Sequence, residues 1–265
     1  MMAIFNKNNP ENTTTWTVKG HFDTDKGRVR KHNEDSLMLK RTGEGTIAIV
    51  ADGMGGHAAG EVASRIAVQT IIKQLLGKGT LDSEKNLHKV VSMANKAILD
   101  SANTNKERRG MGCTTTLMTL RENKLTWAHV GDSRLYMRIG ERLEQITTDH
   151  TVANAQEGAE EQSHVLTRAM GLYETLDIDT GTLLLDASNP YRFLLCSDGL
   201  YDMLNNEEIN DILRIRSPFL ATRCLIEMSN YKGGLDNVSV IVLDAVPGHH
   251  KNKDMDITKE IILPK

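Results

Sequence analysis

The sequence predicts an α+β fold in which antiparallel sheets are covered by helices. Helical patterns follow one another in pairs and do not alternate with single strands, as a parallel α/β fold would require. Turn formers at 121–123 and 138–142 are typical of hairpins and indicate antiparallel pairing. The predicted strands are short and rich in β-branched or aliphatic residues: 46–50, 124–130, 191–196 and 238–245.

Four segments are predicted to be helices. Segment 60–77 places Val62, Ile66, Ile71 and Leu75 on one face. Segment 81–102 begins with Asp82 or Ser83 as N-cap and has an apolar stripe made of Leu87, Val90, Val91, Ala94 and Ile98. Helices are also expected at 205–214, capped by Asn205, and at 218–230, with Ser217 as cap and Pro218 in the first turn.

The composition is that of an ordinary globular protein. The chain has 265 residues, 39% hydrophobic and 25% charged, and a formal net charge of -3, which offers no basic surface for nucleic acid. Its three cysteines, Cys113, Cys196 and Cys224, are odd in number and far apart, which favours a reducing compartment. We found neither a signal peptide nor a long apolar run, and therefore expect a cytoplasmic protein that does not bind membranes.

The glycine-rich stretch ADGMGGHAAGE, residues 51–61, has two interpretations. Gly53, Gly55 and Ala58 match the spacing of a dinucleotide-binding loop. However, the carboxylate of Asp52 would repel a pyrophosphate, and the two successive helices that follow leave no βαβ unit. A metal site is favoured, since Gly53 has no Cβ and its carbonyl can approach an ion closely.

Four aspartates lie at the ends of predicted strands. Asp52, Asp132 and Asp198 follow strands, and Asp236 precedes one. Each alone is also typical of an ordinary turn. Together at one edge they would repel each other unless a multivalent cation lay between them, and an all-oxygen site selects Mg²⁺ or Mn²⁺. Two such ions bridged by one carboxylate can generate a hydroxide nucleophile and neutralise a phosphoryl group.

The segment GRVRKHNEDS, residues 27–36, supplies further polar groups. Arg30 can bind a phosphate through two parallel hydrogen bonds. Glu34 and Asp35 add carboxylates beside the cluster. The alternative interpretation is a solvated, charged turn.

Seven segments resemble, in order and spacing, the metal-dependent type 2C serine/threonine protein phosphatases in their bacterial form. They are TDKGRVRKHNEDS, VADGMGGHAAGEVAS, GCTTT, VGDSR, LTRAMG, LLCSDGL and DNVSVIVL, and the likeness spans about residues 17–245. The resemblance implies a four-layer α/β/β/α sandwich of two antiparallel sheets flanked by helices. It also implies hydrolysis of phosphoserine and phosphothreonine by a metal-activated hydroxide, without a phosphoenzyme.

The resemblance also implies residue roles. Asp52 would bridge two Mn²⁺ or Mg²⁺ ions, with Asp198 and Asp236 on the first. The Gly53 carbonyl and Glu34 would serve the second, and Asp132 with Asp198 would match a third ion. Asp35 would hold water beside the metals, and Arg30 would bind the substrate phosphate. Residues 112–116 and Arg168 match family motifs and are assigned structural roles.

The chain departs from the family pattern at two places. Many eukaryotic members carry a histidine, thought to be the general acid, where this chain has Met54. His57 is the nearest replacement, but we expect its ring to point away from the metals. The segment 151–165 is shorter than the usual bacterial flap over the active site, so it should cover less of the substrate.

We divide the chain into a flexible N-terminus (1–14), one catalytic domain (15–246) and a polar tail (247–265). The expected partners are phosphorylated proteins, substrates of a cognate Ser/Thr kinase, and the expected state is a monomer. Two alternatives stay open: a two-metal phosphohydrolase of small phosphoesters, and a pseudophosphatase that binds phosphoproteins without turnover. The complete set of Glu34, Asp52, Asp198 and Asp236 argues against the latter.

Overall fold

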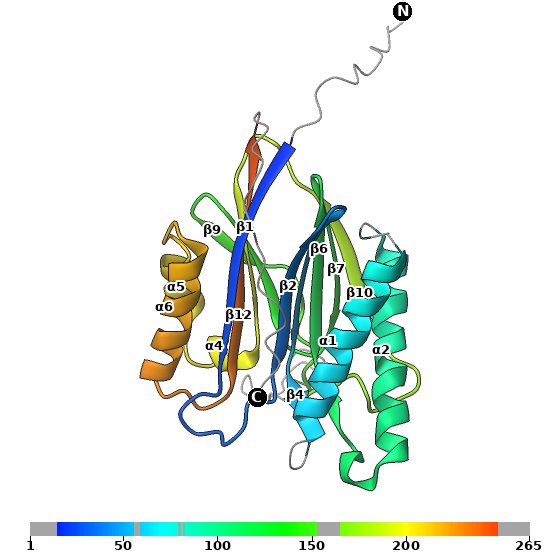
Figure 1. The fold of residues 1–265 in the computed structure, drawn as a ribbon. Helices are drawn as coiled ribbons and strands as arrows, with labels where there is room; N and C mark the ends of the chain where they lie inside the picture. Colours follow the sequence, from blue (N-terminus) through cyan, green and yellow to red (C-terminus); the bar gives the residue numbers. More distant parts are fainter. Residues whose placement is uncertain (1–14, 56–58, 79–80, 82, 153–164, 249–265) are drawn as a thin grey trace, which may run out of the picture.

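The computed structural model describes residues 15–55, 59–78, 81, 83–152 and 165–248. They form two five-stranded antiparallel sheets and a two-stranded ribbon (Figure 1). The first sheet has the order β1 (Thr15–Asp25), β12 (Val238–Gly248), β11 (Tyr191–Cys196), β8 (Arg134–Ile139), β9 (Arg142–Gln145). The second has the order β10 (Asp179–Leu184), β7 (Lys124–Val130), β6 (Thr115–Arg121), β3 (Gly45–Ala51), β2 (Ser36–Thr42). The ribbon pairs β4 (Gly53–Met54) with β5 (Gly112–Cys113).

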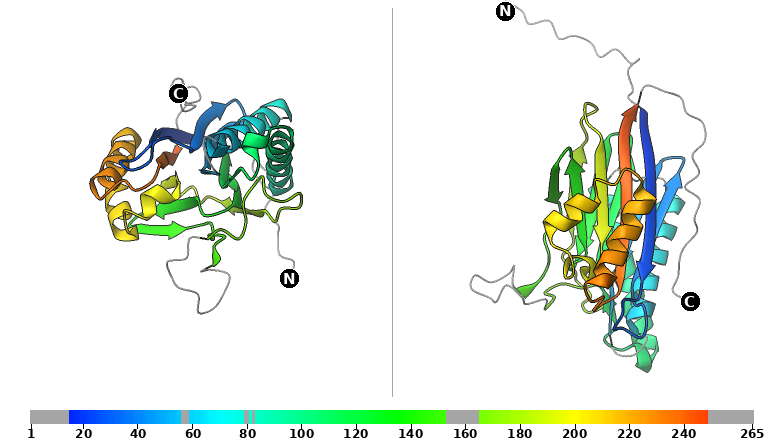
Figure 2. Two further views of the ribbon diagram at one scale, coloured as in Figure 1. Left: turned by 90° about the horizontal axis from the view of Figure 1, so that it is seen from below. Right: turned by 90° about the vertical axis from the view of Figure 1, so that its left-hand side faces the viewer.

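Helices cover the outer face of each sheet, and the two inner faces meet, as Figures 1 and 2 show. The second sheet is covered by α1 (Ala59–Lys78) and α2 (Glu84–Thr104), which is followed by the short η1 (Lys106–Arg108). The first sheet is covered by α4 (Asp198–Tyr201), α5 (Asn206–Ile212) and α6 (Pro218–Tyr231). The predicted four-layer α/β/β/α sandwich is confirmed.

Alternation along the strands produces these layers. In β3, Ile47 and Ile49 pack under α1 and α2, whereas Ala48 and Val50 pack between the sheets. In β11, Phe193 faces the other sheet and Leu194 faces the helices. Because successive side chains point to opposite faces, a shift of one residue in register would exchange the two cores.

The predicted caps and hairpins are largely confirmed. Ser83 caps α2, and Asn205 forms a capping box with Glu208 at α5. Ser217 caps α6, whose first residue is Pro218. The hairpins at 121–123 and 138–142 join β6 to β7 and β8 to β9.

The topology brings distant strand ends to one edge. Since β3 and β7 both run antiparallel to β6, they end at the same edge of the second sheet. In the first sheet, β12 starts beside the end of β11. The loop 26–35 joins the end of β1 to the start of β2 at the same level, at the lower end of the molecule in Figure 1.

The predicted N-terminal segment 1–14 and the tail beyond Gly248 lie outside the described residues, and β12 extends two residues past the predicted domain end at 246. No helix in the described part of the chain is both long enough and apolar enough to span a membrane.

Candidate active site

A pocket opens at the edge where the strand ends meet. Every predicted site residue except Asp35 lines it. The lining residues are Arg30, Glu34, Asp52, Gly53, Met54, Gly55, Thr114, Asp132, Leu166, Asp198, Asp236 and Asn237. The predicted convergence of the four strand-end aspartates is therefore correct.

The carboxylates in this pocket make each other harder to ionise. Burial raises the pKa of Asp52 well above its usual value, and the charges of Asp35 and Asp198 add to this effect. Burial and repulsion from Asp236 raise the pKa of Asp198 to about 6. Burial and the charge of Asp198 raise the pKa of Asp132 to about 7. A cation between these groups would remove this repulsion.

The chemistry of the cluster fits a hard divalent cation. Its ligand atoms are oxygens only, and the buried Oδ1 of Asp198 has no hydrogen-bond partner. Within the described residues, no three acidic, histidine or cysteine side chains already stand in an arrangement that would hold a metal ion. One of these carboxylates, that of Asp236, is bound by the guanidinium of Arg30.

Arg30 reaches the pocket from the loop 26–35. Its Nη2 donates to Oδ2 of Asp236 at 2.5 Å, while its side chain stays 54% exposed. The guanidinium thus stands at the pocket wall with its remaining donors toward solvent, where an incoming phosphate can meet them.

Asp35 lies beneath the pocket, not on its wall. It is only 1% exposed, and Oδ2 accepts a hydrogen bond from Ser197 Oγ at 2.8 Å. Its Oδ1 is buried without a partner, and burial raises the pKa of Asp35 to about 7. Ser197 immediately precedes Asp198, so Asp35 touches the turn that carries one of the pocket carboxylates.

Asn237 holds the loop 26–35 in place, a role that our sequence reasoning missed. Its Nδ2 donates to the carbonyl oxygens of Lys26 and His32, both at 2.9 Å. Its Oδ1 accepts from the backbone N–H of Glu34 at 2.7 Å. The only signal in the sequence is an asparagine next to Asp236.

Thr114 fixes the backbone of Asp52. The Thr114 N–H donates to the Asp52 carbonyl at 2.8 Å, and the Asp52 N–H donates to Thr114 Oγ1 at 3.0 Å. Thr114 Oγ1 also lies 2.6 Å from Ser133 Oγ, in the turn that carries Asp132. Thr114 thus ties two carboxylate-bearing turns together.

Gly53 is required by close packing. A Cβ at this position would collide with the backbone carbonyl of Gly60 in α1 and with the backbone oxygen of Glu34. We attributed this glycine to the approach of a metal. The structure adds a second reason, because the first turn of α1 and the Glu34 backbone already occupy the space.

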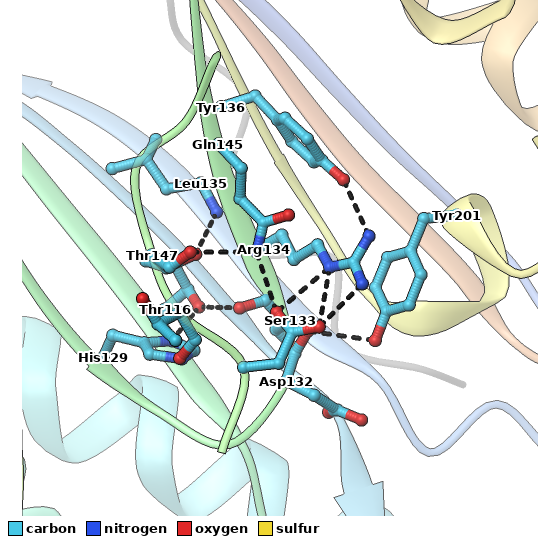
Figure 3. Close-up of polar contacts among 12 residues, drawn as sticks. Thr116, His129, Asp132, Ser133, Arg134, Leu135, Tyr136, Gln145, Thr147 and Tyr201 are labelled. Atoms are coloured by element: carbon cyan, nitrogen blue, oxygen red, sulfur yellow. Dashed lines mark hydrogen bonds and ion pairs between the residues drawn. The ribbon is translucent and has the colours of Figure 1, made fainter. Parts of the chain in front are cut away.

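A polar network behind the pocket joins Asp132 to α4 (Figure 3). The hydroxyl of Tyr201, at the end of α4, donates to the Asp132 carbonyl at 3.1 Å. The Arg134 guanidinium lies 3.4 Å from the centre of the Tyr201 ring and pairs with Asp149 at 2.6 Å. Since α4 begins at Asp198, this network sets the positions of two pocket carboxylates relative to each other. Our sequence reasoning did not identify Tyr201 or Arg134.

The two predicted departures from the family pattern have different outcomes. Met54 lines the pocket, at the position where many eukaryotic members carry histidine. His57 and residues 153–164 of the flap lie outside the described residues, so the predictions about them stay predictions. Leu166, the residue that follows the flap segment, lines the pocket.

Comparisons with known proteins identify the family of the chain. Residues 25–229 match the family described as protein phosphatase 2C. Serine/threonine phosphatase stp of Listeria welshimeri is 34% identical over 243 residues, covering 86% of this chain and 96% of the relative. Protein phosphatase PhpP of Streptococcus pneumoniae is 32% identical over 240 residues, covering 83% and 94%. The crystal structure of the catalytic domain of serine threonine protein phosphatase PstP in complex with two manganese ions superposes with a TM-score of 0.78, at 33% identity, covering 88% of this chain and 100% of that one.

Proposed function

The chain belongs to the protein phosphatase 2C family, and from this premise we propose how its own residues hydrolyse phosphoserine and phosphothreonine in proteins. It is a metal-dependent protein serine/threonine phosphatase. The observation that carries the residue assignment is the convergence of Asp52, Asp132, Asp198 and Asp236 with Arg30 on one pocket.

The carboxylates are assigned to the ions. Asp52, Asp198 and Asp236 would hold the first, and Asp52, Glu34 and the Gly53 carbonyl the second. Asp132 with Asp198 offers a third position. Mn²⁺ or Mg²⁺ bound there would supply an activated water and would neutralise charge on the phosphoryl group. The raised pKa values of Asp52, Asp132 and Asp198 support this assignment, since these groups gain most from a nearby cation.

The remaining polar groups bind and orient. Arg30 would hold the phosphate with the donors that Asp236 leaves free. Asp35 would accept a hydrogen bond from water at the pocket floor through its unpartnered Oδ1. Asn237 holds the loop that carries Arg30 next to Asp236. A phosphate bound by Arg30 would therefore lie beside the carboxylates.

The substrates are phosphoproteins, as in the protein phosphatases that this chain resembles. We further propose a cognate Ser/Thr kinase, a monomeric enzyme and a cytoplasmic location. The location is supported by the three cysteines, which are all free. The small-phosphoester hydrolase and the pseudophosphatase are not favoured, because the relatives are named protein phosphatases and the acidic set is complete.

The test is hydrolysis of a phosphothreonine peptide by the purified chain with Mn²⁺ or Mg²⁺, with and without EDTA. We expect activity that EDTA abolishes, and loss of activity in Asp236→Asn. The matched control is Asp177→Asn, which removes an exposed carboxylate outside the pocket. Turnover of p-nitrophenyl phosphate without turnover of any phosphopeptide would contradict the proposal, as would full activity of Asp236→Asn.

A further inference from the structure

The loop 26–35 presents a group of exposed cations beside the pocket. We call Lys26, Arg28, Arg30 and Lys31 the basic rim. Among the ion pairs of the described residues, one involves the basic rim, the pair between Arg30 and Asp236. The other three side chains are exposed and make no ion pair with the described part of the chain. This local positive charge contrasts with the formal net charge of -3 for the whole chain.

The backbone that carries these cations is held firmly. Asn237 Nδ2 binds the carbonyls of Lys26 and His32, and the Gly234 carbonyl accepts from the N–H of Arg28 at 2.7 Å and of Val29 at 3.3 Å. The backbone of the loop is therefore fixed, while the charged ends of these side chains stay free. The backbone therefore loses little conformational entropy when a partner binds, and only the side chains have to be ordered.

The basic rim is continuous with the pocket. Arg30 lines the pocket wall, and Arg28 and Lys31 flank it along the loop. The side chain of Val29 is 62% exposed between two of these cations, and Leu235, next to Asp236, is 57% exposed. A polypeptide that leaves the pocket on this side would lie over cations and two uncovered apolar side chains.

We infer that the basic rim recognises acidic residues beside the phosphorylated serine or threonine, so that acidic phosphoprotein segments are the substrate class of this enzyme. This inference rests on the proposed function. Its basis is charge complementarity, since the unpaired cations attract carboxylates and the pocket takes the phosphate. Each exposed pair contributes little alone, but several act together on binding and on the rate of encounter.

The test compares two phosphothreonine peptides that differ only at the flanking positions, one with Asp and Glu and the other with Asn and Gln. The variant is the double reversal Arg28→Glu with Lys31→Glu. The matched control is Lys85→Glu with Lys89→Glu, which makes the same charge change on the exposed face of α2, away from the loop. p-Nitrophenyl phosphate reports whether each protein has a working catalytic centre.

The wild type should have the lower KM for the acidic peptide, and this preference should shrink as salt rises. Reversal of both cations should raise the ratio of the two KM values, acidic over neutral, by about tenfold, since two attractions become repulsions. The control should keep the wild-type ratio. Because the ratio is taken within one protein, a general loss of activity does not affect it.

Equal KM values for the two peptides in the wild type, or the same change of ratio in the control, would overturn the inference while leaving the phosphatase assignment intact. Turnover of p-nitrophenyl phosphate with neither peptide hydrolysed would instead overturn the proposed function, and the inference with it.

Discussion

Replacing Asp198 by asparagine should abolish activity and yet stabilise the metal-free protein. Asp198 is a proposed metal ligand, and its Oδ1 is buried without a hydrogen-bond partner. Its charge also adds to the raised pKa values of Asp52 and Asp132. Asparagine keeps the shape of the side chain and removes the charge, so catalysis and stability should change in opposite directions.

The size of the effect follows from the pKa of Asp198, which burial and the charge of Asp236 raise from 3.8 to about 6. A shift of roughly two units corresponds to roughly 3 kcal/mol. Since the folded-state pKa is the higher one, the folded chain retains a proton that the unfolded chain releases, and stability falls as pH rises between about 4 and about 6. Above that range the full cost is present, so Asp198→Asn should gain on the order of 1 to 3 kcal/mol at about pH 8 and little at about pH 4.

Urea unfolding in EDTA at both pH values measures this gain, with Asp177→Asn as the control for removing an aspartate charge. Added Mn²⁺ should then stabilise the wild type more than Asp198→Asn, because the variant has lost a ligand charge. A variant that is less stable than the wild type in EDTA at about pH 8, or whose gain is the same at both pH values, would refute the reasoning about the cluster.

Three other substitutions test the surroundings of the pocket. Arg30→Ala should raise KM by about tenfold or more and change kcat less, and a large fall in kcat at constant KM would show that Arg30 acts mainly on the transition state. Asn237→Ala should cost about 2 to 4 kcal/mol in urea unfolding and raise KM as well, since three hydrogen bonds to the loop are lost; an unchanged KM would argue against a positioning role. Tyr201→Phe keeps the ring under Arg134 and removes the hydrogen bond to Asp132, so it should cost about 1 kcal/mol and weaken Mn²⁺ binding measured by calorimetry; unchanged Mn²⁺ affinity would contradict the role of the network.

Part of the fold, including β3, β7, β11, β12 and the helices α1, α2, α5 and α6, could be predicted because these elements depend on neighbours in the chain. The aliphatic run in 191–196 and the stripe from Leu87 to Ile98 are local patterns, and Ser83, Asn205 and Ser217 cap helices that begin one residue later. Asp52, Asp132, Asp198 and Asp236 were found for the same reason, since each stands next to a predicted strand. The order along the chain of the motifs that contain these residues also gave the family resemblance. That resemblance in turn predicted the four-layer sandwich.

The tertiary structure decided how these groups meet. Arg30 and Asp236 are 206 positions apart, and Glu34 and Asn237 are 203 apart, so no periodicity in the sequence connects them. The burial of Asp35 beneath the pocket and the hydrogen bond from Tyr201 to Asp132 depend on how the two sheets and α4 pack. The sequence by itself determined which residues carry the charge, because residue type and local conformation are encoded locally. Only the packing of the two sheets decided which carboxylates repel each other and which of them pair with a cation. Electrostatic energies depend on the distances between charges, and here those charges come from distant parts of the chain.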